Sequence, residues 1–222
     1  MPDALRESAA ATWLSAAATD QRVYLVERTT GWASWFDPAN RQWGPTRRLG
    51  PDAAVSTWGV APGRAGVDER LVLFGAKRAD KEAECKVVVQ AWEVDGDTLE
   101  LIPSASNDAM PSEMSEKLFP RDDDDDEDLD DTPLSIGVCG NATGGYVYNA
   151  AEPANGAVLY ELREGKAEGC VTTVARWEWV PCAPAVQAEP LGRAILACSP
   201  VGLDELALGV RSAGPRACNA AH

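Results

Sequence analysis

The side chains most often used in catalysis are scarce or poorly placed in this chain of 222 residues. The single histidine, His222, is the last residue, where chain ends fray, so a serine or cysteine nucleophile lacks a candidate imidazole base. No cysteine stands in a basic motif that would activate its thiol. Acidic residues are abundant, but nothing sets one pair apart as general acid and base. The sequence therefore predicts no catalytic residues and no enzyme activity.

The six cysteines do not form a metal-binding pattern. They lie far apart, with no C-x-x-C pair among them: Cys85, Cys139, Cys170, Cys182, Cys198 and Cys218. Their even number permits disulfides, but residues 1–20 lack the basic start and the apolar core of a secretory signal. We expect reduced core thiols in a cytoplasmic or nuclear protein, with no bound metal and no cofactor.

Nine of the 35 acidic residues fall between positions 122 and 131. Like charges at this density repel one another and bury nothing, so we expect a disordered, solvated loop at residues 120–133. The run has no glycine-punctuated loop of the kind that binds Ca²⁺. The remaining 26 acidic residues face 20 basic ones, a balance that disfavours nucleic acid as a partner. No apolar run approaches the roughly 20 residues of a membrane-spanning helix.

A glycine-rich stretch at residues 140–145 invites comparison with a phosphate-binding loop. It lacks the Gly-Lys-Ser/Thr ending of such loops, and the segment after it, Tyr146-Val147-Tyr148-Asn149, has the pattern of a strand. We interpret Gly144 and Gly145 as a tight turn into an inner strand, where glycine allows close backbone approach.

The elements that would position any site are short strands with aromatic residues that recur. One hairpin pattern pairs Phe36 with Trp43 across Asp37-Pro38-Ala39-Asn40, and another pairs Trp92 with Leu99 across Asp95-Gly96-Asp97. In a stretched third form, Tyr160-Glu161-Leu162 is answered by Trp177-Glu178-Trp179. The anchors Phe36, Trp92 and Tyr160 lie 56 and 68 residues apart, so the chain reads as a series of similar small sheets.

Three units follow from this pattern, after an Ala-rich lead-in at residues 1–20 that is expected to be a short helix or disordered. The first unit holds strands at 23–26, 32–36 and from 43 onward. The second has strands at 56–60, 71–75, 86–94 and 99–102, a turn at 62–64 and a charged connection at 77–84. A short helix capped by Ser112 is expected next. The third has strands at 134–139, 146–149, 157–160, 177–180 and 194–198, with a loop at 163–168.

Together these segments resemble the kelch repeats of plant F-box/kelch-repeat proteins. Five stretches carry the resemblance: Phe36-Asp37-Pro38 leading to Trp43, Trp92-Glu93-Val94, Gly144-Gly145-Tyr146, Trp177-Glu178-Trp179-Val180-Pro181 and Cys198-Ser199-Pro200-Val201-Gly202-Leu203. The resemblance implies a β-propeller, in which blades of four strands surround an axis. It also implies a substrate receptor of a cullin-type ubiquitin ligase, whose F-box docks on an adaptor while the propeller holds the target protein. An F-box segment is not evident before residue 21.

We therefore expect an all-β, kelch-type propeller of about three to four blades, an incomplete ring beside the four to eight blades of typical propellers. Residues 1–20 form the lead-in, residues 21–210 the propeller domain and residues 211–222 a disordered tail. The expected function is a non-catalytic protein-interaction module, with Trp58 and Arg64 as example anchors for a protein partner. The four tryptophans Trp43, Trp92, Trp177 and Trp179 are expected to pack between blades. An enzyme acting on a small molecule or sugar, or a degenerate fragment, are the alternatives.

Overall fold

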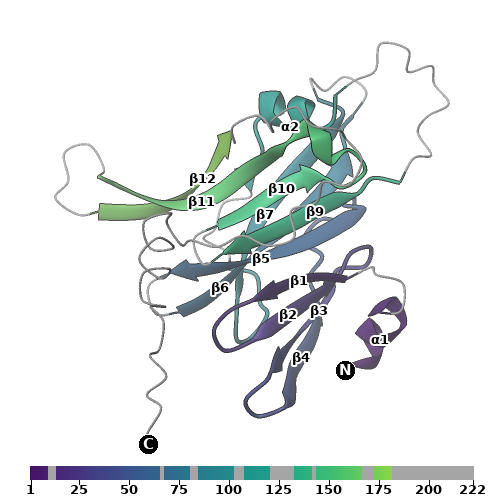
Figure 1. Cartoon of the computed structure of the whole chain (residues 1–222), viewed down its shortest axis with the longest axis vertical. Coiled ribbons are helices and arrows are strands. Elements are labelled where there is room, and N and C mark those ends of the chain that lie inside the picture. The colour runs from purple at the N-terminus through teal and green to yellow at the C-terminus, as the bar shows by residue number, and fades with distance from the viewer. Residues whose placement is uncertain are drawn as a thin grey trace, which may run out of the picture.

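The computed structural model describes residues 1–9, 14–65, 68–80, 85–102, 108–120, 133–141, 144–166 and 173–181. In these ranges the chain forms three antiparallel sheets of four strands each, and the strands of every sheet are neighbours in chain order. The predicted all-β fold of repeated four-stranded sheets is confirmed (Figure 1). The described residues contain no helix that is long and apolar enough to span a membrane.

The first sheet follows a short helix, α1 (Asp3–Ala9). Its strands are β1 (Leu14–Ala18), β2 (Val23–Glu27), β3 (Trp32–Asp37) and β4 (Gln42–Arg48). The sequence placed all of residues 1–20 in a lead-in, whereas Leu14–Ala18 pairs along its whole length with β2. The pairing hydrogen bonds and the burial of Ala17 outweigh the helix preference of an alanine-rich segment.

The middle sheet consists of β5 (Thr57–Ala65), β6 (Asp68–Arg78), β7 (Val87–Asp95) and β8 (Asp108–Ala109). The turn expected at residues 62–64 is wrong, because Pro62 and Gly63 continue β5 in register with β6. Proline is tolerated there since β5 is an edge strand. The strand expected at residues 99–102 forms only in part. Leu101 bridges Val94, and backbone hydrogen bonds join Glu100 to Asp95 and Ile102 to Glu93, while β8 pairs with β7 farther along.

The third sheet consists of β9 (Ile136–Asn141), β10 (Gly144–Asn149), β11 (Ala157–Lys166) and β12 (Thr173–Pro181), with the 3-10 helix η2 (Pro153–Asn155) between β10 and β11. The loop expected at residues 163–168 is wrong for residues 163–166, because β11 stays paired with β12 as far as Lys166. The helix α2 (Ser112–Leu118) forms as predicted, with Met114 and Leu118 toward the core. Its N-cap is Pro111 and not Ser112, since Ser112 is already helical.

The middle sheet is buried on both faces. One core lies between it and the first sheet and contains Leu71, Leu73 and Trp92, while the other lies toward the third sheet and contains Val72 and Phe74. Neighbouring residues of β6 thus enter opposite cores, which explains the uninterrupted apolar run of that strand. In Figure 1 the middle sheet accordingly lies between the other two.

The first strands of the three sheets, β1, β5 and β9, contact one another. Their meeting point is Gly59 of β5, where an added Cβ would overlap Val138 of β9 and approach the hydroxyl of Ser15 in β1 to 3.6 Å. The Ser15 hydroxyl accepts a hydrogen bond of 3.1 Å from the Val60 amide. The sheets therefore spread outward from a shared line of first strands, which is the radial arrangement of propeller blades.

Several predicted segments lie outside the described residues. They comprise most of the acidic loop, the strand at 194–198 and the tail at 211–222, so these expectations stay predictions. The domain limits at 21 and 210 likewise stay a prediction, apart from the shift at β1 described above.

Candidate functional site

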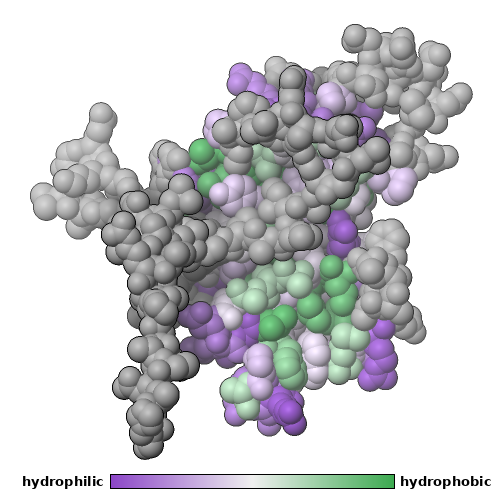
Figure 2. Space-filling view, in the orientation of Figure 1, coloured by the Kyte–Doolittle hydropathy of each residue, from purple (hydrophilic) through white to green (hydrophobic). Residues whose placement is uncertain are grey.

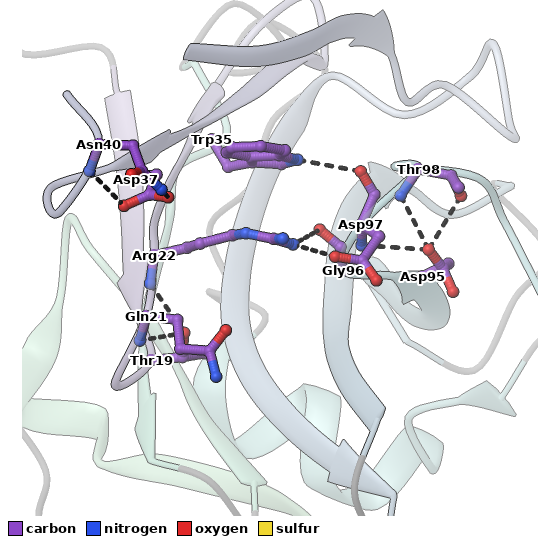
Figure 3. Close-up of polar contacts among 10 residues, drawn as sticks. All are labelled: Thr19, Gln21, Arg22, Trp35, Asp37, Asn40, Asp95, Gly96, Asp97 and Thr98. Carbon is purple, nitrogen blue, oxygen red and sulfur yellow. Dashed lines mark hydrogen bonds and ion pairs between the residues drawn. The ribbon is translucent and has the colours of Figure 1, made fainter. Parts of the chain in front are cut away.

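Three turns gather at one end of the first and middle sheets and form a polar surface (Figure 3). They are residues 19–22 between β1 and β2, residues 38–41 between β3 and β4, and residues 96–98 after β7. We call this surface the turn rim. Turns at strand ends carry binding residues in many repeat proteins, because the sheets hold them in place while their sequences vary freely.

Arg22 joins the two sheets at the turn rim. Its guanidinium donates hydrogen bonds to the Gly96 carbonyl, at 3.3 Å, and to the Asp97 carboxylate. It also lies 4.2 Å from the centre of the Trp35 ring, within the range of a cation–π contact. The Trp35 indole in turn donates to the Asp97 carbonyl at 3.0 Å. The turn after β7 is thus held against the first sheet by one cation and one aromatic ring.

The turns after β3 and β7 are built alike, each from an aspartate that accepts hydrogen bonds from its own turn. Asp37 accepts from the amides of Ala39 and Asn40, at 2.8 and 3.1 Å. These bonds, that of Asn40 first, hold the pKa of Asp37 below its usual value. Four residues after Asp37, Arg41 has a left-handed backbone with φ 56°.

In the turn after β7, Asp95 is the equivalent acceptor to Asp37. Its carboxylate accepts from the amides of Asp97 and Thr98, at 3.1 and 2.8 Å, and its pKa is lowered chiefly by the bond from Thr98. Leu99, again four residues on, has φ 56°. Both turns keep a fixed shape while their outer side chains remain exposed, as at Ala39 and Asp97.

A second polar cluster lies between the outer strands of the middle and third sheets. The Tyr160 hydroxyl is bonded to Asp108 of β8, and the Trp177 indole donates to Glu93 of β7. The rings of Tyr160 and Trp177 are stacked 5.2 Å apart and tilted by only 7°. Burial raises the pKa of Asp108 and also that of the Tyr160 hydroxyl. Both carboxylates here bind aromatic side chains, so the cluster joins the two sheets.

The tryptophan predictions meet different outcomes. Trp92, Trp177 and Trp179 pack in or against the cores between sheets, as expected for residues between blades. Trp43 instead pairs with Phe36 at a ring distance of 5.1 Å and belongs to neither core. Trp58, considered as a partner anchor, is wrong for that role. Only 2% of its surface is exposed, because it packs on Trp92 between the first and middle sheets.

The remaining candidates fall as follows. Arg64 lies in β5, near the end of the strand. Gly144 and Gly145 are paired residues of β10 and not part of a turn, so that half of the interpretation is wrong. A Cβ on Gly145 would come within 2.8 Å of Phe74, which confirms the close approach. Cys85 is a buried free thiol. In the part of the chain that the structure describes, no group of three potential metal ligands comes together.

Sequence reasoning missed Arg22 and Asp97, which connect the sheets at the turn rim. The two residues are 75 positions apart in the chain, and no local pattern marks such a pair. The only available signal was the position of Arg22, immediately before the strand predicted at residues 23–26.

Comparison with known proteins supports the kelch interpretation. The chain is 29% identical over 221 residues to an Arabidopsis thaliana protein described as an F-box/kelch-repeat protein. The alignment covers 96% of this chain but spans only 50% of the relative's length. No protein-family pattern matches the chain, and no solved structure matches it. This similarity, together with the three radial four-stranded sheets of the chain, confirms the resemblance to the plant F-box/kelch-repeat family that the hairpins and paired glycines predicted.

Proposed function

We propose that this chain is a non-catalytic protein-interaction module, equivalent to the substrate-recognition part of an F-box/kelch component of a cullin-type ubiquitin ligase. The observation that carries the proposal is the turn rim, in which turns from two sheets are held rigidly by Arg22, Trp35 and Asp97. The ligase connection rests on the resemblance to F-box/kelch-repeat proteins, the description that the relative carries. We place its activity in the cytoplasm or nucleus, where such ligases act.

A rigid rim favours protein binding for an energetic reason. Association costs the entropy of ordering loops and side chains, and that cost falls when the loops are already fixed by their own hydrogen bonds. The Asp37 and Asp95 turns are fixed in this way. Exposed side chains elsewhere on the turn rim and on these turns, such as Asp20 and Ala39, are then available to provide specificity.

The role divides into two separable parts. Partner binding is assigned to the sheets and turns of this chain. Adaptor recruitment is inferred for this protein only by analogy with the F-box/kelch family, since the chain spans half of its relative's length. A chain that binds its partner without an adaptor would act as an adaptor-free receptor.

The experiment is an affinity purification from plant cell extract with the tagged chain, quantified by mass spectrometry for cullin adaptors and for other proteins. A double variant, Asp20→Arg with Ala39→Arg, changes two exposed positions of the turn rim. The matched control, Ala54→Arg with Glu116→Arg, makes the same types of change at exposed positions away from the rim. Circular dichroism confirms that each variant is folded.

We expect the rim variant to recover at least about tenfold less of the specific partners. Each new arginine would bury an unmatched charge or fail to fit at the interface, and such changes cost several kcal/mol. The control should recover the partners as the unmodified chain does. Equal recovery by both variants would exclude the turn rim as the binding surface. Absence of any specific protein partner would reject the function itself.

A further inference from the structure

The helix α1 lies on the outer face of the first sheet, the face turned away from the middle sheet. It contacts β1, β2 and β3, and Figure 1 shows it beside this sheet. Leu5 of α1 is fully buried, yet it belongs to neither of the two cores described above. Asp3, Ala4 and Arg6 around it are exposed. Leu5 is therefore an anchor that holds α1 on the outer face.

A buried hydroxyl lies on the same face. Tyr24 and Val26 of β2 point into the core toward the middle sheet. Leu25, between them, therefore points outward, as does its cross-strand partner Ser34 in β3. Ser34 is fully buried, and among the described residues its hydroxyl has no hydrogen-bond partner. A polar group buried without a bond destabilises the arrangement that buries it, so α1 covers this face without satisfying it.

An apolar row continues the face toward the turn rim. Val23 in β2, Phe36 in β3 and Trp43 in β4 are cross-strand neighbours, and all three are half-buried. Figure 2 shows apolar residues gathered over the first sheet. Val23 begins the strand after the first turn of the rim, while Phe36 and Trp43 flank the turn between β3 and β4. The outer face and the turn rim thus form one continuous surface.

The helix α1 is short for this surface. Its seven residues span about 10 Å at about 1.5 Å per residue, and isolated helices of this length are marginal in water. The four strands beneath, about 4.8 Å apart, span about 14 Å. An amphipathic helix of three or more turns has the length to contact Leu25, Ser34 and the apolar row together. Such a helix buries more apolar surface than the anchor Leu5 does alone.

We propose that the outer face of the first sheet binds an amphipathic helix of a protein partner, and that α1 occupies part of this surface until the partner displaces it. The partner helix places an apolar side chain where Leu5 lies and others, spaced three or four residues apart, over the apolar row. A polar side chain of that helix bonds the Ser34 hydroxyl. The proposal deepens the proposed function, on which it rests for the existence of a partner.

Displacement of α1 makes binding adjustable. A partner meets only the fraction of molecules in which α1 has left the face, so its apparent affinity falls by that fraction. Changes that loosen α1 should therefore tighten binding, although they remove no contact with the partner. Changes in the face itself should weaken binding. These opposite signs separate the proposal from a purely structural role of α1, in which loosening the helix only destabilises the fold.

The test is the binding of a fluorescent helical peptide to the full chain, measured by anisotropy. The probe has about 18 residues, with leucine at every third or fourth position and lysine or glutamate elsewhere. A scrambled peptide of the same composition is its control. Leu5→Asp should tighten binding at least about tenfold, whereas Ala4→Asp, at an exposed position of the same helix, should leave it unchanged.

Two changes on the sheets test the face itself. Leu25→Glu places a charge among the apolar residues and should weaken probe binding at least about tenfold. Ala54→Glu, at an exposed position away from the first sheet, is the matched control. Circular dichroism checks that all variants are folded, and Leu5→Ala is a milder form of Leu5→Asp that should change binding in the same direction.

Several results would overturn the proposal. They are equal binding of the probe and the scrambled peptide, probe binding insensitive to Leu25→Glu, and Leu5 variants that bind no better than Ala4→Asp. Unfolding of the whole chain by both Leu5 variants would show that α1 is an integral part of the fold, which also overturns displacement. Partner recovery through the turn rim is measured separately. Partners lost on changing the rim but not on changing Leu25 would reject this surface and leave the proposed function in place.

Discussion

Arg22→Met is the change that best isolates the contact between the first two sheets at the turn rim. The Arg22 side chain is only 19% exposed. Methionine keeps most of its apolar stem but removes the guanidinium. The cation–π contact with Trp35 contributes about 0.5–1 kcal/mol. The pair with Asp97 adds at most about 1 kcal/mol, because that carboxylate is 71% exposed. Losing the hydrogen bond to the Gly96 carbonyl costs about 1 kcal/mol.

The expected loss in the free energy of unfolding is therefore about 2 kcal/mol, or a fall of about 5 °C in Tm for a chain of this size. Urea denaturation followed by tryptophan fluorescence measures it directly. Arg47→Met is the matched control, since Arg47 forms an exposed pair with Glu100 at 3.0 Å and should cost below about 1 kcal/mol. High salt should reduce the Arg22→Met effect only partly, because the contacts with Trp35 and Gly96 persist. Equal losses for the two variants would refute the reasoning.

Two further predictions concern the second polar cluster and acid. Trp177→Phe keeps the stack on Tyr160 but removes the donor to Glu93, leaving a half-buried carboxylate without that bond. We expect a loss of about 2 kcal/mol in urea denaturation, and a smaller loss for Glu93→Gln, whose amide oxygen still accepts. A larger loss for Glu93→Gln would contradict this assignment. The second prediction concerns Glu27. Burial is the largest single influence on its pKa and raises it, but the hydrogen bonds from Thr30 and Thr29 together outweigh burial and lower the pKa below 4.5. Asp37 and Asp95 are lowered from 3.8 by turn hydrogen bonds. Groups with lowered folded-state pKa stabilise the fold above their unfolded-state values, and that stability is lost as pH falls through the folded-state values. Stability measured against pH should thus decline below about pH 4.5, and Glu27→Gln should flatten part of the decline. An unchanged slope in that variant would show that the Glu27 bonds do not contribute.

Local chemistry was sufficient to predict most strands and one complete hairpin. The turn after β3 was predicted from Asp37-Pro38-Ala39-Asn40, and the aspartate accepts the amides that such a turn supplies. The pairing of residues 160–162 with residues 177–179 was also predicted and is confirmed, and the structure places Tyr160 opposite Trp179. In these cases the residues that decide the structure are close in sequence.

Errors arose where distant packing decides the local structure. Trp92 and Leu99 show the hairpin spacing of Phe36 and Trp43, yet they are not cross-strand partners. Trp92 pairs with Leu73, and Leu99 enters the same core from a left-handed turn position. The hairpin itself forms in another register, with Val94 opposite Leu101, so Trp92 and Leu99 share a core without facing each other across the strands.

The turn rim could not be predicted as a site for the same reason. Its central contact joins Arg22 to Asp97, in different sheets. Trp58 shows the opposite error, because it was predicted to lie at an interface. Its aromatic side chain would suit that role, but it is buried in the core. Only the radial packing of the sheets decides which aromatic residues are left at the surface.

That radial packing is tested most directly at Gly59, where the first strands of the three sheets meet. The measurement is a double-mutant cycle of unfolding free energies for Gly59→Ala and Val138→Ala, residues that belong to the middle and third sheets. A methyl group on Gly59 overlaps Val138, so Gly59→Ala should cost about 1–3 kcal/mol. In the Val138→Ala background most of that cost should disappear, giving a coupling of about 1–2 kcal/mol. Additive effects in a folded protein would contradict the convergence of β5 and β9, and with it the propeller-like arrangement of the sheets.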